Sequence, residues 1–423
     1  MIYLALIVIN PRSDFFGDEG GYVRHAINLT HGYYTPTTDI DLWWGPGYPI
    51  ILAPFALLKI PWAIAKLLNA FFLFFAVYYF HQTLRLYTNS KYVLHLSYLF
   101  GLYLPFLRFI SYLLTETFVA FLISALTYHF CKLSQSRTRG TRHEIVAGVC
   151  LGYLALTKVL FGYVIVTCLA VAGLVFVFLK RDYVLKKAIV VCCVAFAVCL
   201  PYLLYTYSLT SKVFYWGNSG GMQLYWMATP YSDELGDWQF IEQIRANPKL
   251  AENHLAFYEK VAKLPSIERD DAFRREAIHN IVTHPLKYFT NWLNNIGRLL
   301  FDYPYTYVDQ RLRTYYYMIP NMFIVVLGIL SIYPAWRRRK VTPKEILALL
   351  VFVIIATAGS SLVSAQARQF WVLTPIVDLF IITVLLNSVV VNVPSTELER
   401  VPQSRQPIEL AARDAVGIPR QAR

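Results

Sequence analysis

Charge is scarce in this sequence of 423 residues: Asp, Glu, Lys and Arg together make up 15% of it. Soluble domains carry about 25% charged residues, whereas 57% of this chain is hydrophobic. This composition excludes an ordinary soluble domain and indicates a chain that folds in a lipid bilayer. The net charge of +13 comes largely from short Lys and Arg clusters between apolar segments. Such clusters are typical of polytopic membrane proteins and do not require nucleic acid as a partner.

Several common signatures of soluble enzymes are also missing. The six cysteines lie in or beside apolar stretches without CxxC spacing, which indicates buried thiols rather than metal ligands or disulfides. No GxGxxG or Walker loop follows a strand, so the sequence gives no support to a nucleotide site of the usual kind. No internal repeat of the kind found in many transporters is present. If the protein transfers a group, its donor is expected to arrive through the membrane.

The apolar runs predict an all-α polytopic membrane protein with about ten transmembrane helices. The first run, residues 1–9, is too short to span a bilayer and is interpreted as a short first helix, not as a signal peptide. The predicted helices are residues 1–9, 61–82, 92–106, 112–131, 144–157, 160–179, 188–208, 317–336, 345–363 and 370–391.

The basic residues of the short loops predict the orientation of these helices. With the N-terminus inside, four loops on the cytoplasmic side carry fifteen Lys and Arg residues, against three on the outer side. The four basic loops are residues 83–91, 132–143, 180–187 and 337–344. Two long segments, residues 10–60 and 209–316, then lie on the outer face.

This orientation predicts four regions along the chain. Residues 1–208 form a membrane module that includes the first outer loop, 10–60, and residues 209–316 form a large second outer loop. Residues 317–391 hold the last membrane helices, and residues 392–423 form a polar tail predicted to be cytoplasmic and disordered.

The first outer loop places the acids Asp18 and Glu19 close to a membrane helix. Carboxylates at the start of the helix expected over residues 20–30 can cap its free amides, which is the structural interpretation. The alternative is catalytic, because a dry neighbourhood would raise the pKa of a carboxyl group and make it a usable general base. Asp14 is the weakest candidate of the three acids.

The end of the first outer loop, "DIDLWWGPGYP", holds four candidates for a substrate-binding loop. Asp39 and Asp41 form a DxD pattern like the one that glycosyltransferases use for a metal and a diphosphate, although paired loop aspartates are common. Trp44 and Tyr48 suit either the aromatic belt at the membrane interface or stacking on a sugar.

Isolated charges at the outer ends of helices form the remaining candidates. Glu116 lies one turn into the apolar helix predicted over residues 112–131, where an ionisable group points to function or to a hydrogen-bonded packing role. Arg108, Lys158 and Arg368 stand alone among the outer short loops. They suit either contacts with lipid headgroups or the grip of a phosphate.

The second outer loop combines loop-like and helical sequence. "GNSGGMQLYW" contains glycines and aromatics that would suit an acceptor groove. Farther on, Ala272, Ala277, Ile278, Ile281 and Val282 recur at helical spacing, which predicts one or two amphipathic helices along the membrane surface. His279 and His284 have no partners with ligand-like spacing and are interpreted as interfacial.

Taken in order, these motifs resemble the bacterial branch of the GT-C glycosyltransferases, near the protein O-mannosyltransferase and aminoarabinose-transferase relatives. The resemblance covers the chain to about residue 391. It is carried by "GDEGGYVRHAINLTHGYY", "WGPGYPIILAPF", "LTETFVAFL", "GYLALTKVLFGYVIV", "NSGGMQLYW", "EAIHNIVTHPLKYF" and "QARQFWVLTPIVDLF".

The resemblance implies an inverting transferase in the cell membrane that uses a polyprenyl-phosphate-linked sugar at the extracytoplasmic face. The first-loop acid that activates the acceptor or binds a divalent cation (Mg²⁺ or Mn²⁺) corresponds to Asp18, with Glu19 beside it. Glu116 corresponds to a second acid and metal ligand. Lys158 and Arg368 correspond to the basic residues that contact the phosphate. Arg108 joins them as an expected phosphate ligand because of its place among the outer cations, not because of the resemblance.

Two departures from the family pattern are visible: the first helix is short, and Gln369 follows Arg368 where an aromatic residue is usual. The acceptor implied is a glycan, a lipid or a protein. Two other classes share the lipid substrate. A flippase of lipid-linked saccharides would need polar residues through the depth of the bundle, and an O-antigen ligase or polymerase would rely on Arg and His in its large outer loop.

Overall fold

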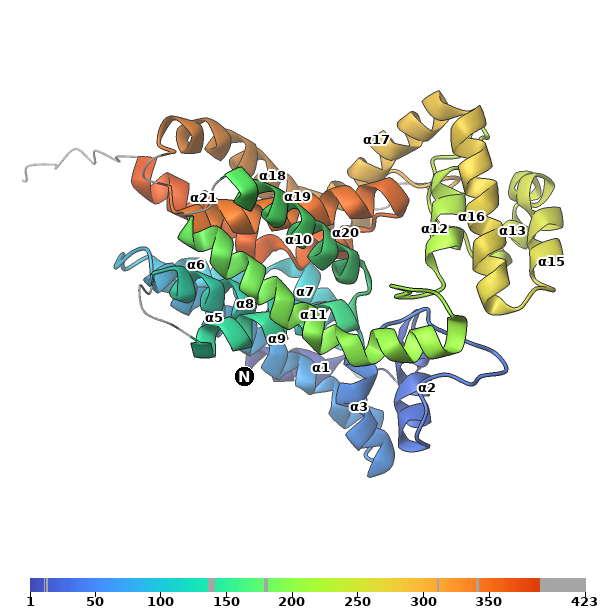
Figure 1. Ribbon diagram of the computed structural model, residues 1–423, viewed down its shortest axis with the longest axis horizontal. Helices are drawn as coiled ribbons and strands as arrows, with labels where there is room; N and C mark the ends of the chain where they lie inside the picture. The colour runs from blue at the N-terminus through green and yellow to red at the C-terminus, as the bar shows by residue number, and fades with distance from the viewer. Residues whose placement is uncertain are drawn as a thin grey trace, which may run out of the picture. The chain divides into compact units, whose positions relative to one another are not determined.

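The computed structural model describes residues 1–388 except positions 11, 13, 136–140, 179–181, 310–311 and 340–341. All regular secondary structure in this described part is helical (Figure 1). The predicted tail, 392–423, lies outside it. So do five basic residues of the predicted cytoplasmic loops, namely Arg137, Arg139, Lys180, Arg181 and Lys340.

Six segments of the described chain are long and apolar enough to cross a membrane, which makes this a multi-pass membrane protein. The first, Trp62–Arg85, combines α4 (Trp62–Lys66) and α5 (Leu68–Arg85). The others are α8 (Glu116–Gln135), α10 (Leu160–Phe178), α11 (Tyr183–Thr210), α18 (Leu312–Arg337, apolar from Thr314) and α19 (Lys344–Val363).

The other predicted spans correspond to shorter helices, so the total of ten remains a prediction. The predicted helix 92–106 is divided in two because the chain leaves helical geometry at Leu102 and Tyr103. The predicted helix 112–131 begins later, at Glu116, which therefore stands at a helix start. The shorter helices are α1 (Ile2–Ile9), α6 (Val93–Gly101), α7 (Leu104–Phe109), α9 (Thr141–Thr157), α20 (Ala367–Trp371) and α21 (Thr374–Ser388).

The first outer loop folds into α2 (Glu19–Thr30) and α3 (Gly47–Leu57), which pack against each other. Gly45 explains how the turn between them reaches the membrane helices. A Cβ atom at Gly45 would overlap the carbonyl of Leu156, at the end of α9, so only glycine allows this approach. The "WGPG" turn is thereby held beside Lys158, which follows α9 directly.

The second outer loop has a hydrophobic core of its own. Trp226, Ile244, Phe273 and Ala277 are buried there, away from the core of the membrane helices. The loop contains α12 (Gly220–Met227), α13 (Ile241–Ala246), α14 (Pro248–Leu250), the π-helix η1 (Ala251–Leu255), α15 (Ala256–Val261), α16 (Ser266–Thr283) and α17 (Pro285–Phe301).

The predicted amphipathic helices correspond to α16 and α17, and their faces differ from the sequence pattern. Ala277 of α16 packs into the core of the loop, whereas Ile278 and Val282 are exposed. Leu286 and Leu293 of α17 are exposed as well. A position along the membrane surface stays a prediction for this region, and these exposed apolar side chains support it.

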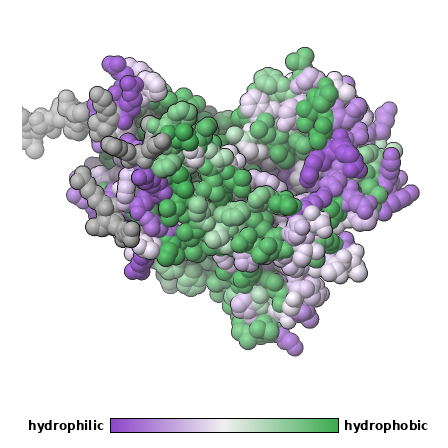
Figure 2. Space-filling model, in the orientation of Figure 1, coloured by the Kyte–Doolittle hydropathy of each residue, from purple (hydrophilic) through white to green (hydrophobic). Residues whose placement is uncertain are grey.

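The surface of the protein separates apolar from hydrophilic residues along the helices. Figure 2 shows an apolar band across the middle of this face, with hydrophilic residues gathered at its two ends. An apolar band between two polar ends is the pattern that a bilayer selects.

Candidate functional site

Asp18 precedes α2 but does not cap it. Its backbone is helical and its side chain makes no capping hydrogen bond. Instead, one carboxylate oxygen accepts a hydrogen bond from the Trp44 indole at 3.1 Å, and the other accepts one from Arg368 Nη1 at 2.7 Å. The structural interpretation as a helix cap therefore does not apply to Asp18.

Glycine at position 21 lets the Trp44 indole approach Asp18. A Cβ atom at Gly21, one turn into α2, would overlap the indole ring. The "DEGG" sequence thus provides a carboxylate and, three residues on, the space for the aromatic donor that orients it.

Arg368 joins Asp18 to Glu116, which comes from a distant part of the chain. Its Nη1 lies 3.7 Å from Glu116 Oε1, and Lys158 Nζ lies 3.3 Å from the same oxygen. Two acids and two cations that are far apart in sequence are thus brought into one cluster, as the orientation of the helices predicted.

Glu116 is the most deeply buried member of this cluster. Its side chain is 2% exposed, and its Oε2 atom has no hydrogen-bond partner. A buried carboxylate oxygen without a hydrogen-bond partner destabilises the folded protein, because it has lost its contacts with water. Here the free oxygen belongs to a cluster of charges beside a cavity, which favours a functional role over simple packing.

The pKa of Asp18 contradicts the expectation from sequence. Burial raises the pKa of this carboxyl group, but the charges of Arg368 and Lys158 and the hydrogen bonds from Arg368 and Trp44 outweigh burial and lower it. The expected raised pKa is wrong because the sequence did not reveal the Arg368 ion pair. Asp18 is held as a carboxylate.

Local packing explains why Arg368 points toward the acids. Ala367, Phe370 and Trp371 of α20 are buried, at i, i+3 and i+4. Arg368 and Gln369 are left facing the other way, and Gln366 Oε1 accepts a hydrogen bond from Arg368 Nε at 2.6 Å. The same ion pairs keep the pKa of Arg368 above its ordinary value, although burial opposes them.

Lys158 and Arg368 line a cavity of about 150 Å³. One part of its wall is polar, with Ser219 just before α12, Gln223 of α12 and Gln369 of α20. The other part is apolar and comes from α10, α19 and the end of α20. The apolar lining residues are Val159, Leu160, Phe161, Ala356, Val372 and Leu373, and Tyr22, Trp43, Trp44, Gly45 and Ser360 complete the cavity.

Glu19, although adjacent to Asp18, is engaged differently. It is fully buried, and its two oxygens accept backbone hydrogen bonds from Phe16 at 2.7 Å and from Leu113 at 2.6 Å. Both oxygens are thus occupied in tying the start of α2 to the segment before α8. These bonds give Glu19 a structural role.

The two aspartates of the DxD pattern lie away from the charged cluster. Asp41 pairs with Arg24, and His25 Nε2 lies 3.6 Å from it. Asp39 is exposed. Both line a second cavity, of about 210 Å³, between the first loop and α16. Trp43 lines both cavities.

Two other candidates do not line the cavity that contains Lys158 and Arg368. Arg108 is exposed, and its guanidinium stands over the rings of Phe109 and Tyr317. Tyr48 is fully buried beneath Tyr22, with 5.3 Å between the ring centroids. Arg108 makes no ion pair with another residue of the described chain.

A divalent cation does not fit the cluster as the side chains stand. The described residues contain no group of three or more His, Cys, Asp or Glu side chains with metal-binding geometry. Asp18 and Glu116 both face the guanidinium of Arg368, which already supplies positive charge between them. The metal role predicted for Asp18 and Glu116 stays a prediction.

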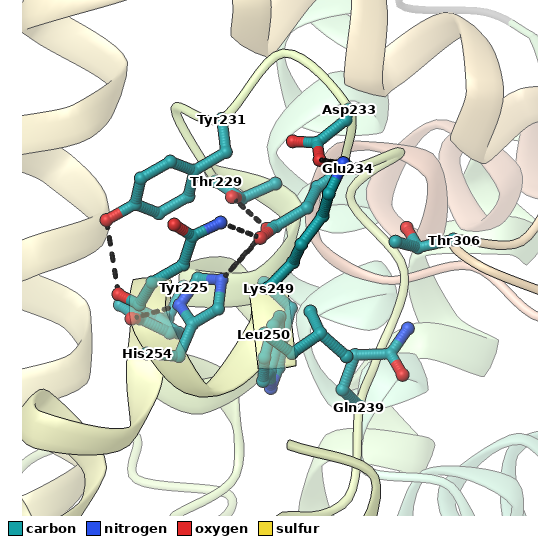
Figure 3. Close-up of polar contacts among 12 residues, drawn as sticks. Tyr225, Thr229, Tyr231, Asp233, Glu234, Gln239, Lys249, Leu250, His254 and Thr306 are labelled. Atoms are coloured by element: carbon teal, nitrogen blue, oxygen red, sulfur yellow. Dashed lines mark hydrogen bonds and ion pairs between the residues drawn. The ribbon is translucent and has the colours of Figure 1, made fainter. Parts of the chain in front are cut away.

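Sequence reasoning missed a second buried cluster, in the second outer loop (Figure 3). His254 Nε2 lies 2.9 Å from both oxygens of Glu234, and His254 Nδ1 lies 2.7 Å from the Tyr225 hydroxyl. Thr229 and Asn253 also donate to Glu234. The residues are spread over thirty positions without a motif, so no spacing signal marks them.

Comparisons with known proteins return structural similarity alone. No family model and no curated protein matches the sequence. The archaeal oligosaccharyltransferase AglB from Archaeoglobus fulgidus, in complex with an inhibitory peptide and a dolichol-phosphate, matches 91% of this chain at 15% identity and a TM-score of 0.48. This chain spans about half, 50%, of the length of AglB.

ArnT from Cupriavidus metallidurans is matched in two structures, each over 76% of the ArnT chain at 11% identity. The TM-score is 0.41 for ArnT bound to undecaprenyl phosphate, covering 91% of this chain, and 0.39 for the apo state, covering 90%.

Proposed function

We propose that this protein is a membrane glycosyltransferase that transfers a sugar from a polyprenyl-phosphate donor to an acceptor at the extracytoplasmic face, with inversion. The observation that carries the proposal is the cavity between α10, α19 and α20. It combines two cations, Lys158 and Arg368, with an apolar wall. A lipid-linked phosphate has the same two parts, an anion and a hydrocarbon chain. AglB and ArnT are similar in fold, and their structures hold dolichol-phosphate and undecaprenyl phosphate.

Lys158 and Arg368 bind the donor phosphate in this mechanism. Arg368 uses a planar guanidinium that suits two phosphate oxygens at once, and Lys158 adds a point charge. When the bond between the anomeric carbon and the phosphate oxygen breaks, the electron pair leaves with the phosphate. The two cations stabilise the charge that develops there.

Asp18 acts on the acceptor hydroxyl. The negative phosphate offsets the charges of Arg368 and Lys158, which help to lower the pKa of Asp18. The basicity of Asp18 therefore rises when the donor is bound. The carboxylate takes the acceptor proton as the acceptor oxygen bonds to the anomeric carbon from the side opposite the phosphate.

Glu116 holds the two cations in place before the donor arrives, because its Oε1 lies near both of them. The second cavity is where the acceptor approaches. It shares the Trp43 indole with the donor cavity, and its polar lining residues include Asp39 and Asn218. An aromatic face beside hydrogen-bonding side chains suits a glycan, so we place a sugar-containing acceptor there.

The first test measures binding of undecaprenyl phosphate to the purified protein by native mass spectrometry. Truncating one partner of a buried charge pair costs 2–5 kcal/mol in typical complexes, so Lys158→Ala and Arg368→Ala should each weaken binding by about thirtyfold or more. Arg108→Ala removes an exposed cation and is the matched control, with an expected change below about twofold. Equal affinity in all four proteins would overturn the proposal.

The second test identifies the sugar and the acceptor. Mass spectrometry of cell-envelope glycans and lipids, with and without the protein, should show one glycosylated product that disappears in cells lacking it. Asp18→Asn should remove the same product while the unglycosylated acceptor accumulates.

A further inference from the structure

Helix α17 is packed with its polar side inward. Asn291, Asn295 and Arg298, at i, i+4 and i+7, are each at most 1% exposed, whereas Leu286 is 82% exposed. Burying amides and a guanidinium is unfavourable unless every polar atom finds a partner. The polar atoms of this buried stripe must therefore find their hydrogen-bond partners within the protein.

Asn295 holds the segment that leads into α20. Its Nδ2 donates to the carbonyl of Ser361 at 2.6 Å, and its Oδ1 accepts the backbone N–H of Ala365 at 3.0 Å. One side chain thus ties together the end of α19 and the chain just before Gln366. Gln366 is the residue that accepts the Nε–H of Arg368.

Arg298 holds Asn295 in turn. It donates to Asn295 Oδ1 at 3.0 Å, and its remaining bonds go to the carbonyls of Leu235, Gly236 and Pro304, each at 3.0 Å. Leu235 and Gly236 follow Glu234, which is fixed by Thr229 and His254 (Figure 3). Through Arg298, the buried core of the second outer loop therefore holds Asn295 in place.

Asn291 belongs to the same stripe but holds a different partner. Its Nδ2 donates to the carbonyls of Met227 and Thr229, at 3.1 and 3.0 Å, and its Oδ1 accepts a bond from Lys287. None of these three bonds reaches residues 361–366. Asn291 and Asn295 are therefore equivalent in chemistry and burial, and they differ in what they support.

We infer that Asn295, fixed by Arg298, is a positioning residue for Arg368: it sets the 361–366 segment so that the guanidinium faces the donor cavity. This inference rests on the proposed function, because it assigns Asn295 to the binding of the donor phosphate. Without the tether, the segment gains backbone freedom, and a guanidinium displaced by an ångström loses its bidentate geometry.

The test compares Asn295→Ala with Asn291→Ala in the full-length protein. Each change removes a buried amide and should lower the apparent melting temperature by a similar amount. Only Asn295→Ala should also weaken the binding of undecaprenyl phosphate, by about tenfold. The KM for the donor should rise to the same degree, while kcat changes less. If Asn295→Ala does not fold, Asn295→Ser offers the same comparison with a smaller polar side chain.

A double-mutant cycle separates positioning from general destabilisation. Once Arg368 is replaced by Ala, Asn295→Ala should weaken lipid binding no further, because there is no guanidinium left to position. The inference is overturned if Asn295→Ala binds the lipid as well as Asn291→Ala, or if its effect persists undiminished beside Arg368→Ala.

The two proposals fail in distinguishable ways. If Arg368→Ala leaves lipid binding unchanged, the proposed function itself fails, and the positioning role fails with it. If Arg368→Ala weakens binding and Asn295→Ala does not, only the positioning role is overturned.

Discussion

The cluster around Asp18 and the pair of Glu234 with His254 are both buried groups of charged or polar side chains, but their surroundings differ. Glu234 and His254 are at most 2% exposed, and both carboxylate oxygens and both imidazole nitrogens have partners within the protein. In the Asp18 cluster, by contrast, Lys158 and Arg368 line a cavity, and one oxygen of Glu116 is left without a partner.

This difference separates a structural cluster from a functional one. When every polar atom of a buried cluster already has a hydrogen-bond partner in the protein, no donor or acceptor remains for a ligand. Such a cluster stabilises one arrangement of the chain. A cluster that places two cations, Lys158 and Arg368, on a cavity wall can bind an anion there. Burial and charge alone would not have distinguished the two.

The largest expected effect contrasts two neighbours in sequence, Asp18 and Glu19. Asp18→Asn should lower the rate of transfer from a polyprenyl-phosphate sugar by about a thousandfold, since loss of a general base typically costs 10²–10⁴. The apparent melting temperature should change little. Transfer is measured with a radiolabelled donor in vesicles.

Glu19→Gln should behave in the opposite way. Its carboxylate accepts two backbone bonds, so the change should destabilise the protein by about 1–3 kcal/mol. Transfer by the folded fraction should persist. Equal loss of transfer in the two variants would mean that Asp18 acts through the fold rather than on the acceptor.

The next prediction concerns Glu234 and His254, whose polar side-chain atoms all have hydrogen-bond partners. Glu234→Ala should destabilise the protein by about 3–5 kcal/mol, because it leaves His254 and Thr229 buried without their acceptor. Thermal unfolding in detergent measures this change. Glu116→Gln is the comparison and should shift the melting temperature much less, because one of its oxygens is already unpartnered. The reverse order would contradict the division into structural and functional clusters.

A smaller effect concerns the pH dependence of lipid binding. Burial lowers the pKa of Lys158 from its ordinary 10.5, assisted by the charge of Arg368 and opposed by that of Glu116. The ammonium group therefore loses its proton at a lower pH than a free lysine. Undecaprenyl phosphate should bind more weakly, by about three- to tenfold, as the pH rises from about 7 to about 10.

Asp18 and Arg368 keep their charge over this range. The pKa of Asp18 is lowered and that of Arg368 is raised, so neither titrates there. Lys158→Arg should then make binding independent of pH, as measured by titration in nanodiscs at each pH. A pH dependence that survives in Lys158→Arg would assign it to another group.

The smallest expected effect is that of metal removal. Because Arg368 already lies between Asp18 and Glu116, treatment with EDTA should lower transfer by less than about twofold. A loss restored by Mg²⁺ or Mn²⁺ would instead establish the metal role predicted from sequence, and would require Arg368 to move from its position between the acids.

Sequence patterns located the candidate site better than they described its chemistry. The sidedness of the basic loops placed Asp18, Glu116, Lys158 and Arg368 on one face, and all four meet in one cluster. The same reasoning included Arg108, which lies over aromatic rings instead. The charge pattern of the loops predicts only on which side of the membrane a residue lies. Two residues on the same side need not meet, and Arg108 makes no ion pair with the cluster.

The polar side of α17 shows a different limit of pattern reasoning. Apolar periodicity assumes that apolar residues face the interior and polar residues face solvent. In α17 a polar stripe is inside, while Leu286, Phe289 and Leu293 are exposed. The pattern therefore predicts a helix correctly but does not reveal the role of Asn295.

By itself, the sequence determined that the chain is helical and that several segments can span a bilayer, and it predicted which charged residues share a membrane face. These properties follow from local hydrophobicity and from charges near helix ends. Only the tertiary structure decided that Arg368 pairs with Asp18, that this pair lowers the pKa of Asp18, and that Glu19 is fully engaged by backbone amides. The physical reason is that a carboxylate's pKa depends on charges within a few ångströms, and here those charges come from residues hundreds of positions away.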